Sequence, residues 1–107
     1  MDAMVQRVEE LGRSLVEVAG VLEPCNPFEV ADFHRLKIGF GGPDQASCSL
    51  RTRSIRLTEG LTRRQTHFDL AHELIELFLE PGELSGPRRE PIIDRGARAM
   101  LLPADLF

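Results

Sequence analysis

Hydrophobic residues near the start of the chain recur at helical spacing. They are three or four residues apart and share one helical face: Met4, Val8, Leu11, Leu15 and Val18. Gly20 follows them, and glycine is common just after the last helical residue. The pattern predicts an amphipathic helix that ends near Gly20.

The next segment changes from a helical to a strand period. The run Asn26-Pro27-Phe28-Glu29 is typical of a helix start, because Asn can cap the first turn and Pro suits it, and this short helix should end near His34. Leu36, Ile38 and Phe40 then alternate with other residues, which favours a strand. A turn over residues 41–44 and two more short strands, 46–50 and 54–57, follow. Because the connections are short, we expect an antiparallel meander.

The last 46 residues predict two helices. Thr62 and Gln65 fit a capping box at the start of a helix that reaches residue 80, with a buried stripe of Phe68, Ala71, Leu74, Ile75 and Phe78. Pro91 suits the first turn of a last helix that Pro103 ends. Its buried face comprises Ile92, Ile93, Gly96, Ala97, Met100 and Leu101. The order predicts an α+β domain, with helices packed on a small three-stranded, mainly antiparallel sheet.

Composition narrows the class of protein. The 107 residues fit a single domain, residues 1–107. A net charge of −4 argues against direct binding of nucleic acid, which needs a basic surface. No apolar run is long enough to span a bilayer, and the first residues do not resemble a secretion signal. Two unpatterned cysteines, Cys25 and Cys48, indicate reduced, buried thiols, so we expect a cytoplasmic protein.

The charges of the helix over residues 62–80 oppose its macrodipole. Arg63 and Arg64 lie at its positive N-terminal end, whereas Glu73, Glu76 and Glu80 lie toward its negative C-terminal end. Like charges four residues apart destabilise an isolated helix by roughly 0.2–0.5 kcal/mol per pair. An arginine from elsewhere in the fold could offset this, or the acidic residues could have a function.

The string His72-Glu73-Leu74-Ile75-Glu76 has the form of a zinc-binding H-E-x-x-H helix with Glu in place of the last His. Residues at i and i+4 project from one helical face toward one ion, and a carboxylate is an acceptable zinc ligand. Glu73 would lie beside the metal-bound water, where it could accept a proton. A solvated acidic face is the alternative interpretation of this short motif.

The stretch from Arg64 to Leu74 resembles the ImmA/IrrE family of metallopeptidase-like proteins, whose active helix reads approximately R-x-x-F-T-x-A-H-E-L-G-H. Phe68 and the Ala71-His72-Glu73-Leu74 core match it. The stretch from Glu90 to Pro103 is similar to the family's second block, E-x-x-A-N-x-F-A-x-x-L-L-M-P. It keeps the acid, the length and the Leu-Leu-Pro ending.

The resemblance implies a zincin-like fold and a metal-dependent peptidase that acts on a protein or peptide. In this family the substrate is often a helix-turn-helix repressor of a phage, mobile-element or stress-response circuit. It implies Glu73 as the catalytic base and His72 and Glu76 as metal ligands. The third ligand would be an acid of the last helix, Glu90 or, one turn along, Asp94.

Several positions depart from the family pattern. Glu76 replaces a histidine, Ile75 a glycine, Asp94 an asparagine and Gly96 a phenylalanine. One histidine and two carboxylates would neutralise Zn²⁺, which makes the bound water less acidic and favours Mn²⁺ or Mg²⁺ as alternatives. A metal-free cluster of His72 with carboxylates is a further alternative, and the protein would then be a degenerate member that serves as a regulatory or protein-binding module.

Other residues have weaker indications. Asp69, three residues before His72, could accept a hydrogen bond from the imidazole and orient it. His34 and His67 are expected to be packing or surface residues. Arg88 and Arg89 are expected to be exposed, and the phenylalanines are expected to lie mostly on buried faces.

Overall fold

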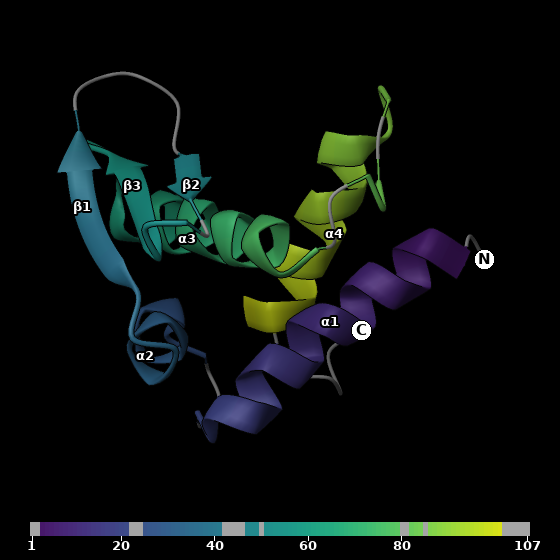
Figure 1. Cartoon of the computed structure of the whole chain (residues 1–107), viewed down its shortest axis with the longest axis horizontal. Coiled ribbons are helices and arrows are strands. Elements are labelled where there is room, and N and C mark those ends of the chain that lie inside the picture. The colour runs from purple at the N-terminus through teal and green to yellow at the C-terminus, as the bar shows by residue number, and fades with distance from the viewer. Residues whose placement is uncertain are drawn as a thin grey trace.

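The computed structural model describes residues 3–21, 25–41, 47–49, 51–79, 82–84 and 86–101. Within these residues the chain forms four helices and three strands: α1 (Ala3–Ala19), α2 (Pro27–Phe33), β1 (Lys37–Gly41), β2 (Ser47–Ser49), β3 (Ser54–Thr58), α3 (Arg63–Phe78) and α4 (Arg89–Leu101). The predicted α+β class and the order of its elements are confirmed (Figure 1). The turn predicted over residues 41–44 lies mostly outside the described residues, as does the end of the last helix at Pro103.

The sheet is mixed, with the strand order β1-β3-β2. β2 is antiparallel to β3, and Cys48 lies opposite Ile55. β1 is parallel to β3, and Ile38 lies opposite the same Ile55 from the other side. The prediction of a meander is therefore wrong in its strand order. A single short connection cannot cross over, but the segment 42–53 between β1 and β3 contains β2 and is long enough to return the chain in parallel.

Side-chain caps fix where two helices begin. The Thr62 hydroxyl oxygen accepts from the Gln65 backbone N–H at 3.2 Å, and the Gln65 side chain accepts from the Thr62 N–H at 3.0 Å. The Asn26 side chain accepts from the Phe28 N–H at 3.0 Å at the start of α2. Both predicted starts are confirmed, because these bonds satisfy backbone donors that the first turn leaves free.

Two glycines let α1 and α4 cross at close range. A Cβ atom at Gly12 would lie 2.4 Å from the carbonyl oxygen of Gly96. One at Gly96 would lie 2.5 Å from a methyl carbon of Val8. Larger residues would force these helices apart. The same Cβ at Gly96 would lie 3.3 Å from a side-chain carbon of Ile75, so this glycine also lets α4 lie close to α3.

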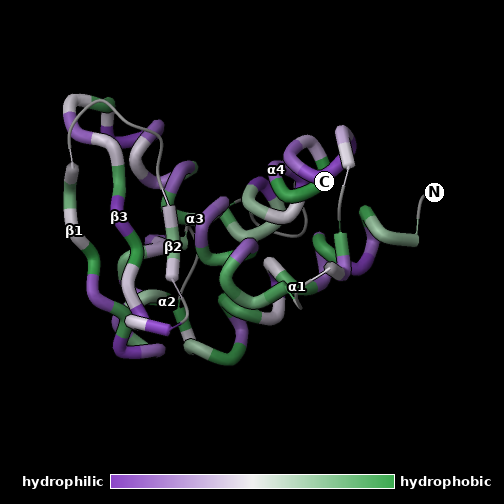
Figure 2. The backbone as a smooth tube through the Cα atoms, turned by 45° about the horizontal axis from the view of Figure 1, so that its top comes forward, coloured by the Kyte–Doolittle hydropathy of each residue, from purple (hydrophilic) through white to green (hydrophobic). Residues whose placement is uncertain are grey.

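The core lies between α1, α3, α4 and the inner side of the sheet. α3 packs against β2, β3 and α4, and hydrophobic segments of the helices meet there (Figures 1 and 2). Ala71, Leu74 and Ile75 are fully buried as expected, whereas Phe68 and Phe78 are only partly buried. The predicted buried face of α4 is also confirmed, with Leu101 at its margin.

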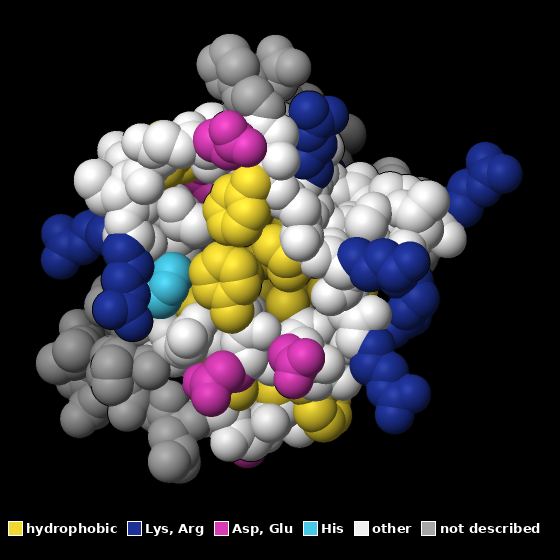
Figure 3. Space-filling view, turned by 90° about the vertical axis from the view of Figure 1, so that its left-hand side faces the viewer, with side chains coloured by type: hydrophobic (Ala, Val, Ile, Leu, Met, Phe, Trp, Pro, Cys, Tyr) yellow, Lys and Arg dark blue, Asp and Glu magenta, His cyan; other side chains and the backbone are white. Residues whose placement is uncertain are grey.

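The phenylalanines depart from the prediction. Phe33 is 51% exposed and Phe40 is 52% exposed. Figure 3 shows hydrophobic side chains gathered in the middle of the face on which β1 lies, with cationic side chains to either side. Phe40 belongs to β1, an edge strand of the sheet, and Phe33 belongs to α2, which contacts that strand. No described helix is both long and apolar enough to span a membrane.

Candidate functional site

The imidazole of His72 lies between two helices and is bonded from both edges of its ring. Its Nε2 atom is 2.7 Å from Glu90 Oε2 and 3.5 Å from Asp94 Oδ1, both on α4. Its Nδ1 atom is 3.2 Å from Glu73 Oε2 and 3.9 Å from Glu76 Oε2, on its own helix. The structure thus brings together the residues that the sequence singled out, around a side chain that is 15% exposed.

Helical spacing and packing explain this convergence. His72 and Glu76 are one turn apart on α3, as are Glu90 and Asp94 on α4, so each pair projects from one face of its helix. The close packing of Gly96 against Ile75 holds the two faces together. Local sequence sets the pairs, and the packing of the helices makes them meet.

The surrounding carboxylates change the ionisation of His72. Burial lowers the pKa of the imidazole, but the hydrogen bond to Glu73 and the charges of Glu90 and Glu73 outweigh burial and raise the pKa to about 9. The ring is therefore a cation at neutral pH. It donates hydrogen bonds to Glu73 and Glu90 and offsets part of the negative charge around it.

Arg89 is the second cation of the cluster. One guanidinium nitrogen is 3.0 Å from Glu76 Oε1 and the other is 3.0 Å from Glu90 Oε1. Its side chain is 29% exposed, so the expectation that it lies in solvent is wrong. It is the arginine from elsewhere in the fold that offsets the acidic end of α3. No local pattern around Arg89 indicates a contact with Glu76, so the sequence alone could not predict this ion pair.

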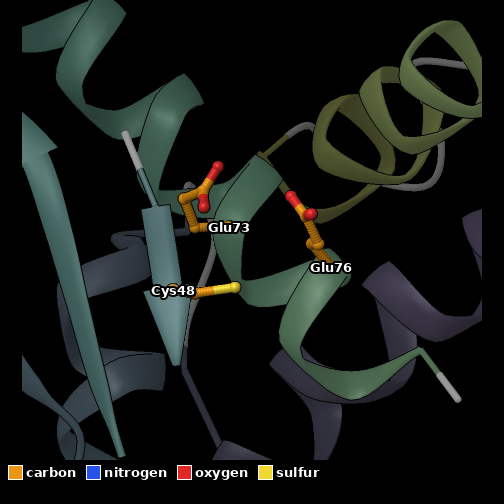
Figure 4. A group of neighbouring side chains, drawn as sticks. All are labelled: Cys48, Glu73 and Glu76. Carbon is orange, nitrogen blue, oxygen red and sulfur yellow. The ribbon is translucent and has the colours of Figure 1, made fainter. Parts of the chain in front are cut away.

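Glu73 and Cys48 form the side of the cluster nearest the sheet. Glu73 is 5% exposed and is the one charged residue classed as buried among the described residues. Figure 4 shows Cys48 extending from β2 toward α3, where Glu73 and Glu76 lie, and ligand atoms of the three residues are all within 4.8 Å of one another. Burial and the charges of Glu73 and Glu76 raise the pKa of the Cys48 thiol to about 12. Cys48 carries no signal in the sequence that connects it with this site, because only the pairing of β2 with β3 places it over α3.

Asp69 lies at the margin of the cluster. Burial raises the pKa of its carboxyl, the His72 cation lowers it, and the charges of Glu73 and Asp94 raise it. No hydrogen bond joins Asp69 to His72 in the described part of the chain, so the orienting contact suggested by the sequence is not formed here. Asp69 acts on the cluster through its charge.

The cluster contains donor atoms of the types that divalent cations bind, and atoms about 2.0–2.1 Å from one tetrahedral ion lie about 3.3 Å apart. The carboxylates around His72 are divided between its two ring nitrogens. Glu90 and Asp94 lie 2.7 and 3.5 Å from Nε2, whereas Glu73 and Glu76 lie 3.2 and 3.9 Å from Nδ1. The carboxylates of Asp69, Glu73, Glu76, Glu90 and Asp94 outnumber the cations of His72 and Arg89. A ligand nitrogen of His72 must lose its proton to bind a metal. The described residues thus contain potential metal ligands, and Cys48, Glu73 and Glu76 form one compact group of them.

The other two histidines lie away from the cluster. The His34 ring packs 4.7 Å from the ring of Phe78, and burial together with the charge of Arg53 lowers its pKa. The His67 ring lies 5.7 Å from that of Phe28. Both agree with their expected roles as packing residues.

No protein-family model matches the chain, and no curated protein matches it.

Proposed function

We propose that this chain is a divalent-metal-dependent peptidase-like hydrolase, as its similarity to the ImmA/IrrE family implies. The observation that supports it most is the convergence of His72 with Glu76 on α3 and with Glu90 and Asp94 on α4. Potential ligands from two helices thereby flank one imidazole, beside a buried carboxylate, Glu73. Because one ion binds only one ring nitrogen, Glu76 would have to turn from the Nδ1 edge to the Nε2 edge to share an ion with an acid of α4.

The proposal gives each residue a role. His72, Glu76 and one acid of α4 hold the metal, which we propose to be zinc, with Mn²⁺ or Mg²⁺ as alternatives because carboxylates suit them. When bound, the ion would polarise a peptide carbonyl and make a water molecule more acidic. Glu73, which is buried beside His72, would accept the proton of the attacking water and transfer it to the leaving amine.

The substrate is proposed to be a protein or peptide, with a helix-turn-helix repressor as the kind of substrate that the family resemblance implies. We propose a cytoplasmic location, since Cys25 and Cys48 are both free thiols and thiols stay reduced there.

One observation favours a second candidate function. Arg89 bonds Glu76 and Glu90, two of the proposed ligands, and so already supplies a positive charge where the ion would act. In that case the cluster is a metal-free structural element, and the protein is a regulatory or protein-binding module that keeps the fold without hydrolysis.

Metal analysis of protein purified without chelator distinguishes the two. We expect about one bound ion per chain in elemental analysis after supplementation with zinc or manganese. Replacement of His72 by Ala or Glu76 by Gln should abolish it, whereas Glu10→Gln, at an exposed position of α1, should not. Glu73→Gln should keep the metal and reduce peptide hydrolysis by about 10²–10⁴-fold. Absence of stoichiometric metal under all these conditions would refute the hydrolase and leave the binding module.

A further inference from the structure

A second candidate site lies near the N-terminal end of α3, where a cavity of about 840 Å³ opens. Arg63, Arg64 and His67 of α3 line it, together with Arg98 of α4. The buried Cys25 and the partly buried Leu101 contribute apolar surface. None of these residues belongs to the His72 cluster.

The three arginines of this cavity have no anionic partner among the described residues. Arg89 is paired with Glu76 and Glu90, and Arg95 with Glu9 at 3.7 Å, whereas exposed arginines such as Arg35 and Arg51 also have no ion pair with a described residue. What sets Arg63, Arg64 and Arg98 apart is that all three line one cavity. Three positive charges that share one cavity favour an anionic ligand there.

The position of the arginines strengthens the positive potential. Arg63 and Arg64 lie in the first turn of α3, where the macrodipole is also positive, so their placement destabilises the free helix. Burial lowers the pKa of His67, and the charge of Arg63 lowers it further. Among the described residues, Glu29 acts on the wall of the cavity, since its charge contributes to the raised pKa of Cys25. A bound anion would relieve the repulsion among the arginines.

The chemistry of the lining defines the ligand class. Guanidinium groups bind phosphate and carboxylate oxygens with paired hydrogen bonds. The cavity has the size of sites that bind small molecules, and Cys25 and Leu101 offer an apolar wall to the rest of the ligand. We infer that this cavity binds a small organic anion, in which a phosphoryl or carboxylate group contacts Arg63, Arg64 and Arg98 and an apolar body faces Cys25 and Leu101.

Calorimetric titration with phenyl phosphate and with phenylacetate, at constant ionic strength, tests this inference. We expect saturable binding of at least one probe, and the tighter one identifies the anionic group. Arg64→Gln and Arg98→Gln should each weaken it about tenfold or more. Arg51→Gln, an exposed arginine that does not line the cavity, is the matched control because it removes the same charge, and it should change affinity less than about twofold.

Amide chemical shifts locate the binding. Shifts confined to the start of α3, the end of α4 and Cys25 support the inference. An equal loss of affinity in Arg51→Gln, or shifts at arginines all over the surface, would show nonspecific electrostatic attraction and would overturn the inference. Absence of binding at millimolar probe would overturn it too. Because the metal centre uses none of these residues, its failure would leave this result unchanged.

Discussion

Arg89 and Glu76 form an ion pair at 3.0 Å that joins the first residue of α4 to the C-terminal half of α3. The same guanidinium also bonds Glu90 at 3.0 Å. Two carboxylates proposed as metal ligands are thus held by an internal cation, and an incoming ion must compete with it. The pair therefore stabilises the metal-free protein but weakens the binding of a metal.

Replacement of Arg89 by Gln should raise metal affinity and lower the stability of the metal-free protein. We expect an affinity gain of about fivefold, the effect of about 1 kcal/mol, because the competing charge is gone. Unfolding free energy should fall by about 0.5–1 kcal/mol, since the pair is partly exposed and screened. Chelator competition and urea unfolding measure the two. Arg95→Gln is the control, because it removes an ion pair between α4 and Glu9 of α1 that lies outside the cluster. A drop in metal affinity would contradict the competition.

The metal-free protein should lose stability as pH rises above neutrality. The folded pKa of His72 is about 9, against an ordinary value of 6.5, so the folded state binds the proton more tightly. This contribution is complete below pH 6.5 and disappears as pH approaches 9. Urea unfolding in the presence of EDTA, at several pH values across this window, measures it. His72→Gln should flatten the profile, and an unchanged slope in that variant would assign the effect to another group.

Cys48 should react slowly with alkylating reagents in the metal-free protein. Burial and the neighbouring carboxylates raise its pKa to about 12, so little thiolate is present. Glu73→Gln removes one of these charges and should accelerate alkylation of Cys48 by several-fold. Cys25, whose pKa is raised to about 11 by burial and by Glu29, serves as the internal control in mass spectrometry of the same sample. Equal acceleration at both thiols would indicate general loosening instead.

Substitution of Gly12 by Ala should destabilise the fold by about 1–3 kcal/mol, as overpacking does. The added Cβ would meet the backbone oxygen of Gly96 at 2.4 Å, and backbone cannot rotate away. Gly39→Ala is the matched control, because nothing lies within 4 Å of a Cβ there. Thermal unfolding compares the two variants. Similar midpoints for both would mean that α1 and α4 can separate without loss.

Local signals made most of the fold predictable. Capping residues such as Asn26 and Thr62 act within one turn, and helical periodicity identifies a buried face directly, so helix starts and faces agree with the structure. The parallel pairing of β1 with β3 was missed because it joins strands separated by another strand, and no local pattern reports such a contact.

The candidate site was predictable in part for a similar reason. One-turn spacing identified His72 with Glu76, and the resemblance to a known family added Glu90 and Asp94. Arg89 and Cys48 could not be found, since each reaches the cluster through tertiary packing alone. The unfavourable placement of Arg63 and Arg64 at the positive end of the helix macrodipole was visible in the sequence. Arg98, which also lines their cavity, lies on a different helix, α4, and no local pattern connects it with them.

The crossing at Gly12 and Gly96 has a consequence for evolution of the centre. The positions of both acids from α4 depend on the close crossing of α4 with α1 at Gly12 and Gly96, which lies on the opposite face of that helix. A larger residue at either glycine would shift Glu90 and Asp94 away from the imidazole without changing any residue of the His72 cluster. If the chemistry of His72 is under selection, selection would therefore also retain glycine at positions 12 and 96.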